Sequence, residues 1–231
     1  MRFTRLCFPA LIVAAIVVHG APPAFASTGA LWHMDEAAGT GTMADSVGSN
    51  TGTWQNITAG VAGDPGISGS TAYQFNGTSS RVIVAAPASS LDPGATSFKY
   101  TAHVKFSVRP PSGDYDIIRK GSPSNTGGFY KMELITTHSG TQTQAHCSML
   151  GSQGKSGHFI AGPDLADGKW HTITCAKTDT GVTLTVDGTQ VGSVTATIGS
   201  IGNSKKLTLG SNPGGGDWFN GTMDEVSVSI G

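Results

Sequence analysis

The stretch DGKWHTITCAKTDTGVTLTVDG at residues 167–188 alternates polar and apolar side chains in two successive segments. In 170–177 an isoleucine and a cysteine share one face, with threonines on the other. In 182–186 two valines and a leucine alternate with threonines, and Asp187-Gly188 follows. A period of two indicates half-buried strands, and Asp-Gly tolerates the positive φ angles of a tight turn. The stretch predicts a strand followed by a β-hairpin, whose return strand lies near 191–194.

The same short alternation recurs along the chain, without a sustained helical stripe of apolar residues. Further strands are predicted at four places: 81–85, 100–108, 129–135 and 226–230. Turn signals from Gly, Pro, Asn and Asp separate such segments about every 8 to 12 residues, which is typical of a sandwich. We therefore predict an all-β fold with two packed antiparallel sheets in a single domain.

The N-terminus has the composition of a secretory signal. Arg2 and Arg5 precede an apolar run at 8–18, and Ala24-Phe25-Ala26 offers a small-residue cleavage site. The run is shorter than the ~20 residues that a transmembrane helix needs. We predict a signal peptide at 1–26, a mature domain at 27–231 and a secreted protein. An uncleaved anchor is the alternative.

Net charge and cysteine content restrict the class of binding partner and the oxidation state of the cysteines. Loss of Arg2 and Arg5 leaves 12 Lys and Arg against 15 Asp and Glu, a net charge of −3 with His neutral. This balance argues against nucleic acid as a partner. Cys147 and Cys175 remain after cleavage, and an isolated pair in an exported protein predicts a disulfide. Two buried free thiols are the alternative.

Several blocks, in order, resemble laminin-G-like, concanavalin-A-like jellyroll domains. They span most of the predicted mature chain: ALWHMDE at 30–36, ADS at 44–46, NTGTW at 50–54, YQFNGT at 73–78, DGKWHTITC at 167–175, VDG at 186–188 and FNGTMDEV at 219–226. The resemblance implies a two-sheet antiparallel jellyroll sandwich, of the kind found in concanavalin-A-like lectins and glucanases. It also implies the Cys147–Cys175 bond, because bacterial members pair a cysteine before the WH strand with the one inside it.

The resemblance also implies a structural calcium ion. In related folds the first and last strands lie side by side and hold calcium near their aspartates, and Asp35 and Asp224 occupy those places. Asn76 and Gly77 are the further candidate ligands, since calcium prefers carboxylate and carbonyl oxygens. The alternative is that Asp224 faces water and caps its loop. A histidine metal site from His138, His146 and His158 is a second alternative.

Catalytic patterns that this fold can carry are incomplete here. Asp114 and Asp116 form the only acidic i,i+2 pair, and they follow a Pro-Pro-Ser-Gly segment, which favours entry into a strand. Gln144-Ala145-His146 is similar to the QxH strand of jellyroll alginate lyases, but no tyrosine follows Tyr130 to act as the base. No Gly-x-Ser-x-Gly nucleophile turn occurs. The sequence therefore predicts no catalytic residues.

Two aromatic residues are candidates for ligand binding. Sugar sites combine an exposed ring with a few fixed polar groups. Trp218, in a Gly-rich loop, is the first candidate, and Tyr115 is the second.

These features favour a secreted, non-catalytic binding module for a polysaccharide or cell-surface glycan, with no membrane insertion after signal cleavage. A structural domain that binds only a protein partner is the alternative. A polysaccharide-degrading glycosidase or lyase is a lesser one.

Overall fold

The computed structural model describes residues 28–67, 70–85, 87–111, 113–154 and 156–231. The predicted signal peptide lies outside the described residues. Within the described part of the chain, no helix is long and apolar enough to cross a membrane.

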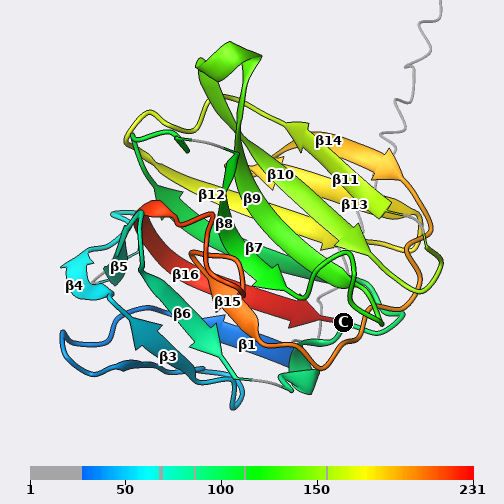
Figure 1. Ribbon diagram of the computed structural model, residues 1–231, viewed down its shortest axis with the longest axis horizontal. Coiled ribbons are helices and arrows are strands. Elements are labelled where there is room, and N and C mark those ends of the chain that lie inside the picture. The colour runs from blue at the N-terminus through cyan, green and yellow to red at the C-terminus, as the bar shows by residue number, and fades with distance from the viewer. Residues whose placement is uncertain (1–27, 68–69, 86, 112, 155) are drawn as a thin grey trace, which may run out of the picture.

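Two antiparallel sheets pack face to face, as the all-β prediction requires (Figure 1). The back sheet contains, in spatial order, β14 (Thr189–Thr195), β13 (Gly181–Val186), β12 (Trp170–Lys177), β7 (Phe98–Lys105), β16 (Asn220–Ile230), β5 (Thr71–Asn76) and β4 (Thr58–Ala62), while β1 (Thr28–Trp32) pairs with β16. The front sheet contains β11 (Ser156–Ala161), β10 (Gln142–Leu150), β9 (Phe129–Thr137), β8 (Asp114–Lys120), β15 (Leu207–Leu209), β6 (Arg81–Val84), β3 (Gly52–Gln55) and β2 (Thr42–Met43). Two 3-10 turns, η1 (Ser89–Leu91) and η2 (His138–Gly140), lie between strands.

The predicted hairpin is confirmed. β13 and β14 pair antiparallel, with Val186 opposite Thr189. Asp187 and Gly188 connect them with φ angles of 49° and 76°. These are the left-handed angles that a two-residue hairpin turn needs. β12 buries every second residue, as its alternation predicts.

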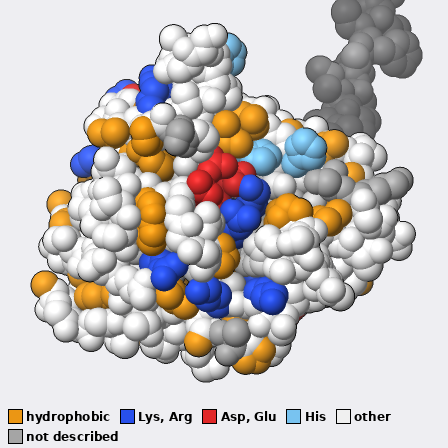
Figure 2. Space-filling model, in the orientation of Figure 1, with side chains coloured by type: hydrophobic (Ala, Val, Ile, Leu, Met, Phe, Trp, Pro, Cys, Tyr) orange, Lys and Arg blue, Asp and Glu red, His pale blue; other side chains and the backbone are white. Residues whose placement is uncertain are grey.

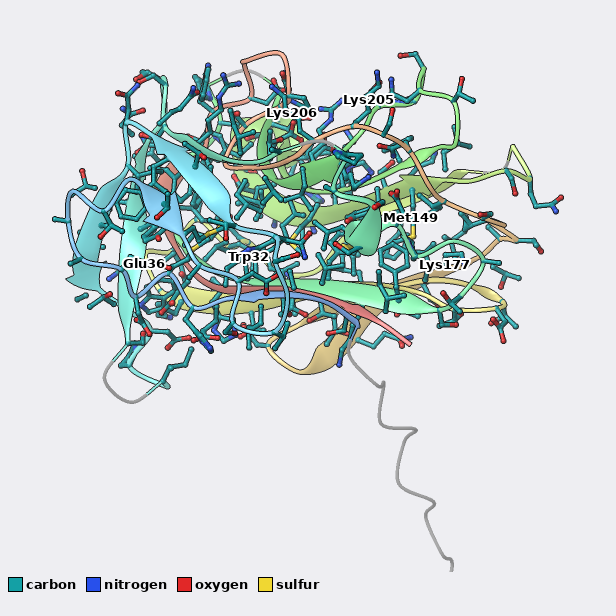
Figure 3. The ribbon with its side chains drawn as sticks, turned by 90° about the horizontal axis from the view of Figure 1, so that it is seen from below. Trp32, Glu36, Met149, Lys177, Lys205 and Lys206 are labelled. Carbon is teal, nitrogen blue, oxygen red and sulfur yellow. A yellow bond between two sulfur atoms is a disulfide. The ribbon has the colours of Figure 1, made fainter. Side chains whose placement is uncertain are left out.

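The core lies between the two sheets and is rich in aromatic rings. Figure 3 shows Trp32 and Met149 between the layers, and both are fully buried. Tyr100 on β7 and Tyr130 on β9 meet across the sandwich, with ring centroids 5.2 Å apart. The Tyr100 hydroxyl donates a 2.9 Å hydrogen bond to the Lys131 carbonyl, so its polar end is satisfied inside the core.

The predicted disulfide joins the two sheets. Cys147 lies on β10 of the front sheet and Cys175 on β12 of the back sheet, with their Cα atoms 5.7 Å apart. Both residues are fully buried. A bridge between neighbouring strands would cross-link a single sheet, whereas this one fixes the spacing of the two layers.

Removing the disulfide is expected to destabilise the domain without unfolding it at room temperature. The 28-residue separation corresponds to about 3–4 kcal/mol in the chain-entropy account, which is roughly a 10 °C fall in melting temperature for a domain of this size. Thermal melts of Cys147→Ala/Cys175→Ala and wild type measure it. A thiol assay of the denatured wild type is the control, and equal melting temperatures would contradict the stabilising role.

Candidate functional site

The outer face of the front sheet carries a row of charged side chains. Asp116 on β8 lies opposite Glu133 on β9, and Glu133 lies opposite His146 on β10. Alternate residues of a strand point to the same face, so neighbouring strands place these side chains side by side. Figure 2 shows acidic side chains at the centre of this face, with basic and histidine side chains next to them. We call Asp116, Glu133 and His146 the charged row.

Hydrogen bonds fix the charged row. Glu133 accepts from the Lys131 ammonium through Oε1, and its Oε2 lies 2.6 Å from His146 Nδ1. Arg119 Nη1 donates to Asp116 Oδ2 over 2.8 Å. The other oxygen, Asp116 Oδ1, is buried and has no hydrogen-bond partner among the described residues.

The two carboxyl groups of the row have opposite pKa shifts. Burial raises the pKa of Asp116 to about 8, although the Arg119 guanidinium pulls it down. Burial also acts on Glu133, but the hydrogen bonds from His146 and Lys131 outweigh it and hold the pKa of Glu133 well below its usual range. Burial, with the negative charges of Glu133 and Asp217, raises the pKa of Asp114 to about 7. Of the two carboxyl groups of the row, Glu133 is therefore ionised at neutral pH and Asp116 is largely protonated.

A hollow of about 380 Å³ opens beside the charged row and includes Arg119 in its wall. Its lining comes from three segments: Arg119, Gly121, Ser122 and Asn125; Lys205 and Lys206; Asn212, Pro213 and Gly214. Three cationic side chains and no acidic one belong to this lining.

The loop at 211–219 closes over the edge of the row. Asp116 N donates a 2.9 Å hydrogen bond to the Asp217 carbonyl, which joins this loop to β8. Trp218 is half-buried, and the Arg81 guanidinium carbon lies 5.6 Å from the centre of its ring. Trp218 thus lies in the same loop as the wall residues Asn212 to Gly214.

Tyr115, the second predicted ligand residue, lies on the inner side of β8. It is 2% exposed, its ring packs edge to face against Phe106 and Phe219, and its hydroxyl donates to the Val108 carbonyl. Because its neighbours Asp114 and Asp116 point outward, Tyr115 must point inward. The Tyr115 ring therefore offers no exposed platform in this structure.

The predicted calcium ligands fall into two separate groups. Asp224 Oδ2 accepts from Asp64 N and Ser70 Oγ, at 3.0 and 2.7 Å, and Oδ1 accepts from Glu225 N. Asp35 Oδ1 accepts from Thr71 N at 2.6 Å.

Asn76 and Gly77 lie at the opposite end of β5 from Thr71. Asn76 Oδ1 accepts from the backbone of 78–80, and Gly77 N donates to the Phe219 carbonyl. Protein donors thus hold both Asp224 oxygens, Asp35 Oδ1 and Asn76 Oδ1, and the separation of the two groups does not fit a four-residue calcium site. Calcium binding stays a prediction.

The predicted histidine group is only partly assembled. The His146 and His158 rings lie 6.2 Å apart on the front sheet, whereas His138 is in η2 at the tip of the β9–β10 hairpin. In the described ranges, no group of three or more His, Cys, Asp or Glu side chains is placed to hold a metal ion.

Sequence reasoning missed Glu133 and the two adjacent lysines at 205 and 206. It treated Asp116 as part of a strand entry and His146 as part of a lyase-like pattern. The available signal was that Asp116, Glu133 and His146 each occupy an outward position of a predicted or plausible strand. The order in which those strands pair cannot be read from local sequence.

The strand order and the two packed sheets define a lectin-like jellyroll domain. The family model of the concanavalin A-like lectin/glucanases superfamily matches residues 76–229. The match covers more than half of the sequence, so the chain belongs to this superfamily, as the resemblance predicted. No curated protein matches the chain.

Three solved structures show the same fold at low identity. The binding domain of Paraclostridial Mosquitocidal Protein 1 aligns with TM-score 0.62 and 14% identity over 88% of this chain and 48% of that chain. The botulinum neurotoxin serotype D binding domain aligns with TM-score 0.61 and 12% identity, over 88% of this chain and 47% of that chain. The third structure is domain 4 of AbnA, a GH43 extracellular arabinanase from Geobacillus stearothermophilus, in complex with arabinotriose. It aligns with TM-score 0.58 and 17% identity, over 89% of this chain and 93% of that chain. The chain spans about half the length of the two toxin domains.

The raised pKa values of Asp116 and Asp114 predict that stability falls as pH rises from about 5 to 8.5. The folded chain keeps protons on these groups above the ordinary carboxyl pKa of about 4, where the unfolded chain has lost them. Ionising the buried Asp116 in the fold costs up to about 1.4 kcal/mol per pH unit, and the partly exposed Asp114 contributes less because solvent screens its charge. Denaturant melts across this range measure the slope.

Asp116→Asn should flatten this slope, and Asp179→Asn, at an exposed turn of the back sheet, should leave it unchanged. A wild type with equal stability at pH 5.5 and 8.5 would contradict the assignment.

Asp224→Ala is expected to lower stability by about 2–4 kcal/mol, because it leaves the donors of Asp64, Ser70 and Glu225 without their acceptor. The same melts, run with calcium and with a chelator, test the calcium prediction. A calcium-dependent rise in the melting temperature of wild type that the variant loses would support it, and identical wild-type curves would contradict it.

Proposed function

We propose that the chain is a secreted, non-catalytic binding module that binds a saccharide across the outer face of the front sheet. The observation that carries the proposal is the hollow of about 380 Å³ on this face, which is lined by Arg119, Lys205 and Lys206 and lies beside the hydrogen-bonded charged row. Small-molecule sites of about 300–1,000 Å³ typically present a few fixed polar groups beside an apolar surface.

The face supplies both kinds of contact. In the row next to the charged row, Lys131, Ser148 and His158 lie opposite one another on β9, β10 and β11. Such groups donate and accept hydrogen bonds as sugar hydroxyls require. Ile160 is 42% exposed on β11, and Trp218 is half-buried at the other side of the face. Because β11 and β6 lie at opposite sides of this face, each of these two side chains offers apolar surface to a different sugar unit.

The burial of the two carboxyl groups favours binding over hydrolysis. A separated pair of pKa values, as at Asp116 and Glu133, is also the pattern of an acid and base in glycosidases. However, Asp116 is fully buried and Glu133 is 1% exposed. Both Glu133 oxygens are held by Lys131 and His146. A substrate oxygen cannot approach either group without displacing these contacts, so the row acts as a fixed polar floor.

The structural comparisons support a binding role. One similar structure is an arabinanase domain in complex with arabinotriose, and two others are toxin binding domains. The signal-like N-terminus and the disulfide between the sheets suit an extracellular module. A protein-interaction domain without a small ligand remains the second candidate function.

A glycan panel tests the proposal, with binding and product release measured in the same wells. We expect binding without released oligosaccharide, and we expect Trp218→Ala to weaken it by about tenfold, as loss of an aromatic contact does. Trp170→Ala is the matched control, because Trp170 is also half-buried beside a cation, Lys105, but lies in the back sheet.

Released oligosaccharide would contradict the non-catalytic assignment. An absence of binding to any glycan would contradict saccharide binding and favour the protein-interaction alternative. Equal losses of glycan binding in the two tryptophan variants would contradict a binding site on the front sheet.

A further inference from the structure

We infer that the hollow beside the charged row binds the anionic group of an acidic saccharide, a carboxylate or a sulfate. The inference rests on the proposed function and adds the class of ligand. Three cations, Arg119, Lys205 and Lys206, line this one hollow, although the whole chain has a net charge of −1. Figure 3 shows the two lysines next to each other on the outer side of the front sheet.

The lysine charges are not neutralised by the protein. Among the described residues, neither Lys205 nor Lys206 has an ion pair, whereas Lys120 and Lys131 each pair with a carboxylate. Lys205 is exposed and Lys206 is half-buried. Two adjacent ammonium groups without a counter-ion repel each other, and an anion that binds between them relieves that repulsion.

Arg119 supplies a directed group at the wall of the hollow. Its Nη1 donates to Asp116 Oδ2 and its Nε donates to the Gly121 carbonyl at 3.2 Å. A guanidinium carries five N–H groups in a plane, so an anchored arginine still has donors for a ligand oxygen. Although burial acts to lower the pKa of Arg119, the nearby carboxyl groups of Asp116, Glu133 and Asp217 raise it, so the guanidinium stays a cation at the wall of the hollow.

The walls of the hollow are held in place before a ligand arrives. Beneath the lysine segment, the buried Lys120 ammonium donates to the Asn203 carbonyl at 2.7 Å, and Asn203 Oδ1 accepts from Lys205 N. On the facing walls, Asn125 Oδ1 accepts from Ser122 N and Asn212 Oδ1 accepts from Gly214 N. A preorganised site loses less conformational entropy on binding.

The position of the hollow favours a saccharide over a free inorganic anion. Arg119 belongs both to the wall of the hollow and to the outer face of β8, next to the charged row. When the acidic group of one sugar unit occupies the hollow, the neighbouring sugar units of the same oligosaccharide therefore lie over β8, β9 and β10. Inorganic sulfate would use the hollow alone.

Calorimetric titration of the full domain with four probes tests the inference. The probes are a hexuronate oligosaccharide, a sulfated oligosaccharide, a neutral oligosaccharide of the same length and inorganic sulfate. We expect one or both acidic oligosaccharides to bind at least about tenfold more tightly than the neutral one and than sulfate. Binding should weaken as salt rises from about 0.1 to 1 M, because the screening length falls. The two acidic arms distinguish a carboxylate from a sulfate ligand.

The variant Lys205→Gln/Lys206→Gln should lose about tenfold or more in affinity for the acidic oligosaccharide and less than about twofold for the neutral one. The control Lys99→Gln/Lys169→Gln changes one half-buried and one exposed lysine on the back-sheet side and should keep the wild-type affinity. Unchanged melting temperatures in both variants show that the fold is intact.

Neutral and acidic oligosaccharides that bind equally, with no effect of the lysine variant, would overturn the inference and leave the proposed function standing. Sulfate that binds as tightly as the acidic oligosaccharides would also overturn it, by reducing the site to an anion site. If no oligosaccharide binds, the proposed function itself fails. Equal losses of affinity in the two lysine double variants would show a general effect of net charge and would contradict an anion site in the hollow.

Discussion

The contact between the two sheets across β10 and β12 is the constraint on which the outer face depends. Cys147 points inward from β10 and is bonded to Cys175 of the back sheet. Its neighbour His146 must then point outward, because successive side chains of a strand alternate. The same constraint acts on β9, where Tyr130 packs in the core against Tyr100 and Glu133 lies outside. The inner packing thus fixes which polar residues form the face.

The carboxyl groups on the outer face of the front sheet are buried, and their burial has a free-energy cost. Carboxyl groups taken out of water must be neutralised or paired. Glu133 is paired by Lys131 and His146, whereas Asp116 has only Arg119 and keeps an unpartnered oxygen, so burial favours its protonated form. The row is consequently held by hydrogen bonds, with Glu133 as its ionised carboxyl group. The excess positive charge lies beside it, in the hollow, where no acidic side chain lines the wall.

Most of the fold was predictable because its signals are local. The alternation in 170–177 and the Asp187-Gly188 turn correspond to β12 and the β13–β14 hairpin. The interpretation of single residues was weaker. Tyr115 was the second candidate for ligand binding, and its ring is 2% exposed because the outward aspartates on either side require it to point inward. Trp218 was placed correctly in a loop, and the structure adds that this loop borders the hollow.

The sequence by itself determined the strands, the turn, the cysteine pair and the membership in a sandwich family, since each depends on residues close together or on the order of motifs along the chain. Only the tertiary structure decided that Asp116, Glu133 and His146 form one row, and that Arg119 shares a hollow with Lys205 and Lys206. Strand pairing brings these residues together, and pairing is set by burial of the whole core. A shift of one position in register would turn the strand residues Asp116, Arg119, Glu133 and His146 to the opposite face.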